Sequence, residues 1–305
     1  VRILAPQPYM DNFLDKIFFR SRNLDYISQN LINLTTQTPA KRIFEALNTY
    51  SERSEVRYVG GCVRKVIKKE IVDDIDLATN LVPSEVCDAL KKQNINFYET
   101  GIQHGTITAI IDDHKYEITS LRKDVSTDGR HAKVEFSSDW KEDAARRDFS
   151  INSIYSDKDG NLFDPYNGKK DLESGNINFI GDSENRIKED YLRILRYVRF
   201  FINYSNQSHD LNIIKKIKKN IGGVSKLSSE RLLDEFKKLT RSNAFLKIFN
   251  DKISLELIEI IFPQLKNLEN FKKLNSHAID NLAKVDFIFL LSLLIVDGSD
   301  NTDYF

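Results

Sequence analysis

The feature that most constrains the fold is a glycine pair followed, after a short helical stretch, by two closely spaced aspartates. Between Tyr58 and Asn80 the chain reads YVGGCVRKVIKKEIVDDIDLATN. Gly60-Gly61 interrupts a short apolar strand, and the apolar and basic residues after it favour one or two helical turns. Helix N-termini present unpaired N–H groups and a positive dipole end. A glycine turn at this point would therefore let a phosphate chain approach the backbone closely.

The second predicted strand, Asp73 to Thr79, carries two carboxylates on one face. Side chains alternate along a strand, so Asp74 and Asp76 point the same way while the residues between and after them face the core. Neighbouring carboxylates repel each other unless a cation lies between them, and with a phosphate substrate two Mg²⁺ ions are the usual solution. A surface strand with two solvated aspartates is the alternative. The glycine turn at this spacing favours the metal site.

Three further strands follow, separated by turns that contain glycine and aspartate. They are Ile95 to Thr100, Thr106 to Ile111 and Lys115 to Leu121. Together with helices, the pattern predicts an α+β head whose sheet is antiparallel or mixed, with about five strands. Glu117 would be a third carboxylate near the metals if the second and fifth strands are neighbours. A half-exposed strand glutamate explains this residue equally well.

A pair of adjacent arginines ends the next predicted helix. Within WKEDAARRDFSINSIY, the helix starts at Trp140 and Arg146-Arg147-Asp148 terminates it. Adjacent residues do not face the same side of a helix, so we expect one arginine to serve a substrate and the other the fold. The arginine fork suits phosphate or ribose, and Asp148 could accept from a ribose hydroxyl. A solvated run of charges remains an alternative for these residues in isolation.

From Ser183 onward the composition becomes helical, and NRIKEDYLRILRYVRFF predicts one amphipathic helix. Asp190 and Arg193 lie three apart and would be neighbours on its surface. They could form an ordinary surface ion pair, or they could read a base edge. In the second case the carboxylate accepts from the exocyclic amine of cytosine or adenine, and it repels the carbonyl of guanine or uracil. Lysine-rich segments further on, such as Asn212 to Asn220, could meet an RNA backbone or simply be solvated.

Composition excludes several classes of protein. The 45 Lys and Arg residues balance 45 Asp and Glu residues, so no wholesale attraction to nucleic acid is implied. Cys62 and Cys87 are the only cysteines, which excludes a disulfide framework and fits a cytoplasmic protein. The longest apolar run, Phe287 to Val296, is too short to span a bilayer, and we expect no membrane partner. The chain starts at Val1 without a methionine, so we expect that the natural N-terminus is not included.

With these motifs in this order, the chain from Ala40 to Phe262 resembles the class II tRNA nucleotidyltransferases, or CCA-adding enzymes, and the related bacterial poly(A) polymerases of the DNA polymerase β superfamily. YVGGCVR and DDIDLAT are similar to the first motif of the family. GIQHGTITAII and YEITSLRKDVSTDGRHA resemble its sheet and its flexible loop, which here contains Asp128-Gly129. EDAARRDFSINSIY is similar to its ribose-recognition motif, and EDYLRILRYVRF to its protein-template motif.

The resemblance implies a role for several residues, grouped by the part of the substrate that each group meets. These are Asp74 and Asp76 as metal ligands; Gly60, Gly61 and Arg64 at the triphosphate; Arg147, Asp148 and Asn152 at the ribose; and Glu189, Asp190 and Arg193 at the incoming base. One position departs from the family pattern, because Lys65 stands where the family usually has aspartate. The chain is also shorter at its C-terminal end than family members with a complete body and tail.

The implied organisation is an N-terminal helical extension (1–39), a nucleotidyltransferase head (40–165) and an all-helical neck and body (166–305) that recognises RNA and base and is truncated at its end. The implied activity adds C and A residues to the 3′ end of tRNA from CTP and ATP, with two Mg²⁺ ions and release of pyrophosphate. Alternatives are a poly(A) polymerase, an enzyme that adds only CC or only A, and an enzyme that nucleotidylates a small molecule. A non-catalytic RNA-binding relative, with Lys65 as a mark of lost activity, is the alternative from another class.

Overall fold

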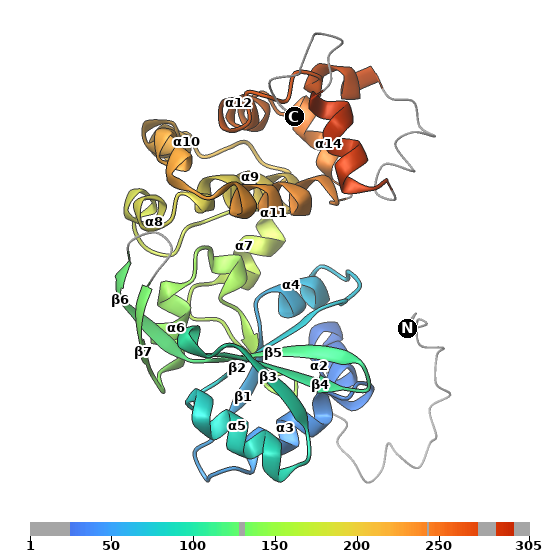
Figure 1. Ribbon diagram of the computed structural model, residues 1–305, viewed down its shortest axis with the longest axis vertical. Helices are drawn as coiled ribbons and strands as arrows, with labels where there is room; N and C mark the ends of the chain where they lie inside the picture. The colour runs from blue at the N-terminus through green and yellow to red at the C-terminus, as the bar shows by residue number, and fades with distance from the viewer. Residues whose placement is uncertain (1–24, 128–131, 243, 274–284, 296–305) are drawn as a thin grey trace.

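The computed structural model describes residues 25–127, 132–242, 244–273 and 285–295. It has two parts along its longest axis, which lie one above the other in Figure 1. The N-terminal part is a twisted sheet with helices packed against it. The C-terminal part, coloured yellow to red, consists of helices.

Within the described residues, seven strands form one mixed sheet in the order β3-β4-β5-β2-β1-β8-β9. Only β2 and β5 pair in parallel; every other neighbouring pair in this sheet is antiparallel. The sequence predicts an antiparallel or mixed sheet, and the structure has the mixed form. The sheet is larger than the expected five or so strands because two two-residue strands extend it beyond β1. The strands are β1 (Val56–Val59), β2 (Ile75–Thr79), β3 (Asn96–Gly101), β4 (Thr106–Ile111), β5 (His114–Ser120), β8 (Tyr155–Ser156) and β9 (Leu162–Phe163).

Helices cover one face of this sheet and form the first core. They are α2 (Tyr26–Thr36), α3 (Ala40–Asn48), α4 (Gly61–Ile67) and α5 (Pro83–Lys92). Local capping starts them: the carboxylate of Asp25 accepts from Ser28 N at 2.8 Å in front of α2, and a proline opens α5. Fully buried residues such as Leu31, Phe44 and Leu90 pack onto Tyr58 and other apolar residues of the strands. Burial of these apolar faces holds the helices on the sheet.

The opposite face carries a smaller core and one short helix, α6 (Trp140–Arg146). Val59, Ala78 and Tyr155 face this side, because side chains alternate along each strand. A two-stranded ribbon, β6 (Arg122–Thr127) and β7 (Ala132–Phe136), lies beside it and reaches towards the helical part (Figure 1). The segment expected to be a flexible loop therefore contains, in its described residues, a paired ribbon. Asp128-Gly129 lies outside the described residues.

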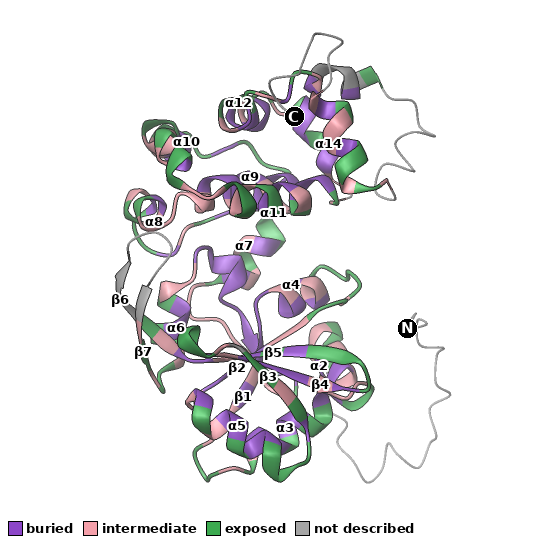
Figure 2. Cartoon of the chain, viewed as in Figure 1, coloured by how far each residue is buried: buried purple, intermediate pink, exposed green. Residues whose placement is uncertain are grey.

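The helical part is built around one buried helix, α9. Figure 2 shows that buried residues run along α9, and Leu195, Val198 and Phe200 from this helix belong to the largest core. Among the described residues, no helix is long and apolar enough to cross a membrane. The helices are α7 (Gly168–Ser174), α8 (Ser183–Glu189), α9 (Leu192–Tyr204), α10 (Leu211–Asn220), α11 (Ser229–Thr240), α12 (Lys252–Ile261) and α14 (Phe287–Ile295), and short 3₁₀ turns occur at Ile102–His104, Ser150–Asn152, Ile221–Lys226, Phe245–Asn250 and Leu268–Lys273.

The single helix expected from Ser183 onward was wrong, since α8 ends before Asp190 and α9 begins after it. Asp190 has an extended backbone, with φ −154° and ψ 106°. Its Oδ1 accepts from Leu192 N at 3.1 Å, a local bond that competes with continuous helical pairing. Asp190 and Arg193 are therefore not successive residues on one helix surface. The break turns the Asp190 side chain away from the direction that a straight helix would give it.

Candidate active site

The glycine turn, a carboxylate and a guanidinium meet at the end of β1. Gly60 has φ +66° and ψ −113°, a conformation that glycine adopts without steric cost. A β-carbon built on Gly61 would lie 3.8 Å from Oδ2 of Asp76. One built on Gly60 would lie 3.8 Å from Nη1 of Arg147. Residues from β1, β2 and the end of α6 thus converge on the turn.

The carboxylates lie on adjacent strands. Asp76 in β2 and Glu117 in β5 are register partners, which confirms that the second and fifth strands are neighbours. Asp74 is exposed and lies immediately before β2. Burial, together with the charges of Asp74 and Glu117, raises the pKa of Asp76 to about 6. A carboxyl whose ionised form is disfavoured in this way gains stability from a cation beside it.

The carboxylates of Asp74 and Asp76 fit a Mg²⁺ ion that is also bound by substrate phosphates. They do not fit a metal site made of protein ligands alone. No group of three or more His, Cys, Asp or Glu side chains in the described part of the chain could hold a metal ion. Mg²⁺ is usually bound by one or two carboxylates, waters and substrate phosphates. Asp74 and Asp76 supply such carboxylates. Glu117 lies opposite Asp76 but is not gathered with both aspartates into one ligand set.

Arg146 and Arg147 both contact one buried carboxylate, that of Asp143 in α6. The distances are 2.7 Å from Arg146 Nη2 to Oδ1 and 3.1 Å from Arg147 Nη2 to Oδ2. The expectation that the adjacent arginines face different sides was therefore wrong. The helix ends at Arg146, and the extended backbone of Arg147 (ψ 160°) lets its side chain turn back to the same acceptor.

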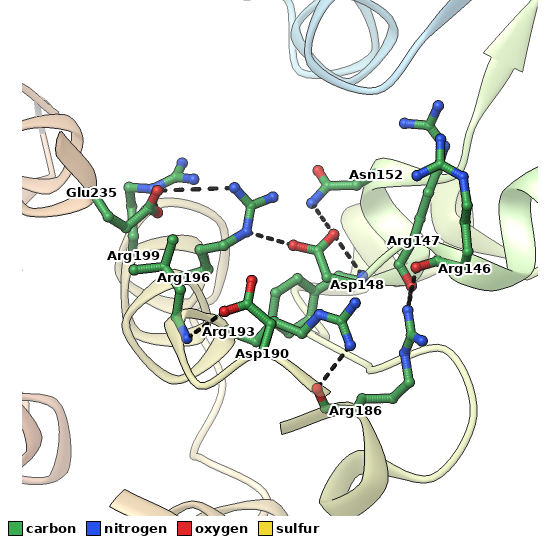
Figure 3. A network of polar contacts seen from close by, with 12 residues as sticks. Arg146, Arg147, Asp148, Asn152, Arg186, Asp190, Arg193, Arg196, Arg199 and Glu235 are labelled. Carbon is green, nitrogen blue, oxygen red and sulfur yellow. Dashed lines mark hydrogen bonds and ion pairs between the residues drawn. The ribbon is translucent and has the colours of Figure 1, made fainter. Parts of the chain in front are cut away.

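Asp148 is anchored between the sheet-containing part and α9. Its Oδ1 accepts from Phe149 N and from Asn152 Nδ2, both at 2.9 Å, and its Oδ2 accepts from Arg196 Nε at 2.6 Å (Figure 3). Burial alone would raise the pKa of Asp148, but Arg196 and the hydrogen bond from Asn152 lower it well below its usual value. The residue is 8% exposed, so its carboxylate is a fixed, ionised acceptor.

Arg64 lies against α9 and is only 8% exposed. Its Nη1 donates to Oδ1 of Asn152, and its guanidinium carbon lies 5.0 Å and 5.1 Å from the ring centroids of Phe200 and Tyr204. Its Nε has no hydrogen-bond partner among the described residues. Arg64 therefore links α4 to α9 directly, through stacking on two aromatic rings of α9. It also links α4 to the turn that contains Asn152.

Asp190 and Arg193, which the sequence suggested as an ion pair, each have another partner in the structure. Arg193 donates from Nη1 to Oε2 of Glu189 and to the carbonyl of Arg186, both at 2.7 Å. Asp190 accepts at 2.8 Å from Nη2 of Arg231, a residue of α11. The ion pair between Asp190 and Arg193 that the sequence suggested is thus replaced by two separate pairs. In Figure 3 the Asp190 carboxylate and the Arg193 guanidinium point towards different partners.

Six charged residues of this network were not identified from the sequence: Asp143, Arg186, Arg196, Arg199, Arg231 and Glu235. Glu235 is 2% exposed and its carboxylate lies between Arg196, 3.9 Å away, and Arg199. One signal was available, since Glu235 stands beside Phe236 on the apolar face of an amphipathic helix. A charged residue at a position facing the core needs a buried partner. The sequence pattern does not say which residue that partner is.

Two basic features have partners within the protein. Lys65, at the position where the family pattern has aspartate, donates to Oδ1 of Asp73, and this hydrogen bond lowers the pKa of Asp73. Lysines of α10 bridge to neighbouring helices: Lys216 reaches Asp182 at 3.0 Å, and Lys219 reaches Glu184 at 2.9 Å. Such pairs favour a structural use of these lysines over free contact with an RNA backbone.

Comparison with protein families gives two matches in order along the chain. The poly A polymerase head domain matches residues 56–178, and the probable RNA and SrmB-binding site of polymerase A matches residues 210–269. The human mitochondrial CCA tRNA nucleotidyltransferase 1 is 38% identical over 249 residues, which are 80% of this chain and 57% of that protein. The CCA-adding enzyme of Lactobacillus johnsonii is 35% identical over 226 residues, 72% of this chain and 56% of that protein. The chain thus spans little more than half the length of these relatives.

Solved structures show the same fold. A CCA-adding enzyme in an apo form superposes with a TM-score of 0.69 at 20% identity, covering 90% of this chain and 68% of that one. The Bacillus stearothermophilus CCA-adding enzyme in complex with CTP superposes with a TM-score of 0.62 at 23% identity, covering 83% and 67%. The arrangement of sheet and helices described above is therefore that of known CCA-adding enzymes.

Proposed function

Because the chain belongs to the family of tRNA nucleotidyltransferases and poly(A) polymerases, we propose that it adds C and A residues to the 3′ end of tRNA. In this reaction the terminal 3′-oxygen forms a bond to the α-phosphorus of CTP or ATP with loss of its proton, and pyrophosphate leaves. One observation carries the proposal: the Gly60-Gly61 turn lies close to both the carboxylate of Asp76 and the guanidinium of Arg147. A triphosphate that is bound together with a cation needs this combination of groups.

Asp74 and Asp76 would hold the two Mg²⁺ ions that we propose as cofactors. When bound, Mg²⁺ stabilises charge on the phosphate oxygens and makes the attacking hydroxyl more acidic. Glu117 lies beside Asp76 on the neighbouring strand, and we assign it the role of strengthening the negative field that attracts the cations. Burial is the main cause of the raised pKa of Asp76, and the charges of Asp74 and Glu117 add to it, so a bound cation would stabilise the ionised carboxylate.

The remaining predicted residues divide between the triphosphate and the ribose. The resemblance implies Arg147 at the ribose, but its Nη1 lies near Gly60, so we propose instead that its guanidinium faces the phosphates together with the backbone of the glycine turn. Asp148 and Asn152 would lie at the ribose, and their mutual hydrogen bond at 2.9 Å supports a shared role. Arg64 contacts Asn152 and is stacked against α9. We therefore propose that Arg64 holds Asn152 in place at the ribose site and also stabilises the Gly60-Gly61 turn, which begins its own helix, α4.

Selection of the base is assigned to Glu189, Asp190 and Arg193. Glu189 holds Arg193, and Arg231 holds Asp190, so the donor and the acceptor are each fixed by a different partner. A carboxylate oxygen accepts more than one hydrogen bond, so Asp190 can still receive the amine of cytosine or adenine. Fixing both side chains in advance lowers the entropy that base binding would cost.

We propose the same division of the chain as above, with a head at about 40–165, a body at 166–305 and an N-terminal extension at 1–39. A cytoplasmic location is also proposed, on the basis of two cysteines that are both free and buried. Poly(A) synthesis, or addition of only CC or only A, remains the alternative within the family. The presence of Asp74, Asp76, Asp148, Asp190 and Arg193 argues against a non-catalytic RNA-binding relative.

The test is incubation of the protein with tRNA that lacks its 3′ CCA, plus Mg²⁺ and CTP, ATP or both, followed by sequencing of the products. CC with CTP alone and CCA with both nucleotides is the expected result. A long A tail would indicate a poly(A) polymerase. Binding of tRNA without any extension would overturn the proposed activity.

A further inference from the structure

We propose that Asp143 is a positioning residue whose buried carboxylate aims Arg147 at the triphosphate-binding turn. This inference rests on the proposed function, since it assigns Arg147 to the triphosphate. Asp143 itself is 1% exposed and has no path to a substrate. Any effect on nucleotide binding must therefore pass through the side chains that it contacts.

Asp143 contacts two of the three guanidinium nitrogens of Arg147 and leaves the third free to meet a ligand. Nε and Nη2 of Arg147 lie 3.2 Å and 3.1 Å from Oδ2 of Asp143. The third nitrogen, Nη1, is the one that lies near Gly60, 3.8 Å from the position of a β-carbon there. Because the guanidinium is planar, anchoring two of its nitrogens sets the direction of the third.

Tyr155 closes a triangle with these two groups. Its hydroxyl donates to Oδ2 of Asp143 at 2.7 Å and accepts from Nε of Arg147 at 2.9 Å. The guanidinium of Arg147 also lies over the Tyr155 ring, with its carbon 5.2 Å from the ring centroid. Rotation of the Arg147 side chain would break its contacts with Asp143 and with Tyr155 together. The arginine is thus held in its binding orientation before any nucleotide arrives, which reduces the ordering cost of binding.

The charges around Asp143 do not cancel. One carboxylate faces two guanidiniums, those of Arg146 and Arg147, so one positive charge is left over. Burial alone would raise the pKa of Asp143, but the two arginines and Tyr155 lower it well below its usual value, so the group is ionised at neutral pH. The surplus charge also reaches Asp76, whose pKa Arg147 lowers against the stronger effects of burial and of the other carboxylates. An excess cation beside the glycine turn is suited to a triphosphate.

The backbone on the other side is fixed by the helical part. Nη2 of Arg186 in α8 donates to the carbonyl oxygens of Arg146 and Arg147. Figure 3 shows Arg186 reaching these two residues. The main chain of Arg147 is therefore held from α8 while its side chain is held from α6. Both anchors are needed if the guanidinium is to keep one position relative to Gly60.

The experiment compares Asp143→Asn with Glu142→Gln in the full chain. Both changes remove one carboxylate charge from α6. Glu142, however, is exposed, and its carboxylate accepts from Ser137 rather than from Arg146 or Arg147. Binding of CTP and ATP is measured by calorimetry without turnover, alongside tRNA affinity and thermal unfolding. We expect Asp143→Asn to weaken both triphosphates about tenfold, as is typical when an outer partner of a charged site is lost. Its tRNA affinity, and all properties of Glu142→Gln, should stay unchanged.

A double-mutant cycle separates positioning from a general structural role. In an Arg147→Ala background, Asp143→Asn should weaken triphosphate binding no further, because its effect acts through Arg147. If Asp143→Asn lowers the unfolding temperature but leaves triphosphate affinity at the wild-type level, the positioning role is wrong. If Asp143→Asn does not fold, Tyr155→Phe replaces it, since it removes the two hydrogen bonds of the Tyr155 hydroxyl and leaves the ion pairs. The positioning role is supported if Tyr155→Phe weakens triphosphate binding in the wild-type background but has no effect in the Arg147→Ala background. Unchanged triphosphate binding of Tyr155→Phe in the wild-type background overturns it.

Failure of the proposed function gives a different result. A wild-type protein that binds neither CTP nor ATP would contradict the proposed function, and the positioning role with it. Wild-type binding with an unaltered Asp143→Asn affinity would contradict the positioning role alone.

Discussion

Asp190, the residue that follows α8, forms an ion pair with Arg231 of α11, with 2.8 Å between Oδ2 and Nη2. The two residues are 41 positions apart, and the contact joins two helices of the body at the proposed base-reading site. The other carboxylate oxygen of Asp190 caps α9 through Leu192 N. The orientation of Asp190 therefore depends on the packing of α11 against the start of α9.

The first prediction is that Asp190→Ala changes which nucleotides are used. Loss of the acceptor should lower the use of CTP and ATP and raise the relative use of UTP and GTP, by about 1–3 kcal/mol of discrimination. Arg231→Ala should act in the same direction but less, because Asp190 remains and only its orientation is released. Single-nucleotide incorporation with all four triphosphates measures both effects.

Lys238→Ala is the matched control for Arg231→Ala, because Lys238 is an exposed cation on the same helix. It should leave nucleotide preference unchanged. A drop in overall activity of Asp190→Ala with an unaltered preference for C and A would show that Asp190 does not read the base.

The second prediction concerns the metal ligands. Asp76→Asn removes a carboxylate whose ionised form is disfavoured, so the metal-free protein should unfold at the same temperature as wild type or slightly higher. Nucleotide addition should be abolished, and so should the rise in unfolding temperature that Mg²⁺ plus CTP gives wild type. Asp73→Asn, a change at an exposed neighbour, should keep both properties. Near-normal turnover in Asp76→Asn would mean that the metal site has been misassigned.

The third prediction is a pH dependence that comes from Asp148. Its pKa is lower in the folded protein than the usual value near 3.9, so its contribution to stability is complete above that value and is lost as the pH falls below it. Asp148→Asn should therefore be much less stable than wild type at pH 7. The difference in unfolding temperature between the two proteins should shrink as the pH falls from about 4 towards 2. Circular dichroism melts across this range measure it, and a difference that is constant with pH would contradict the ion pair with Arg196.

The fourth prediction is about Gly168, the first residue of α7. A β-carbon there would lie 2.1 Å from the carbonyl oxygen of Ser150, in the turn that carries Asn152. Gly168→Ala must push this turn away and should destabilise the protein by about 1–3 kcal/mol, as overpacking does. At Gly222 nothing lies within 4 Å of the same position, so Gly222→Ala is the control. Denaturant unfolding of both variants provides the measurement, and equal stabilities would show that the close approach is not maintained.

The sequence by itself determined the local elements and the family. The β-branched and apolar residues of Thr106 to Ile111, between turns that contain glycine and aspartate, predict a strand with the bounds that the structure has. The Gly60-Gly61 turn and the strand around Asp76 are likewise signalled by residues within a few positions of each other. These features follow from backbone preferences and from periods of two and 3.6 residues, which act over short distances along the chain. Several such motifs in a fixed order were sufficient to identify the family.

Only the tertiary structure decided which charged residues are partners. Asp148 pairs with Arg196, 48 residues away, and Asp190 with Arg231, while the nearer Arg193 pairs with Glu189. The local pattern favoured Arg193 as the partner of Asp190, because it assumed an unbroken helix. A charged side chain in a partly buried site takes the partner that packing brings within reach, since leaving it unpaired costs more than any local preference. That choice depends on how α11 packs on α9, and no short stretch of sequence records it.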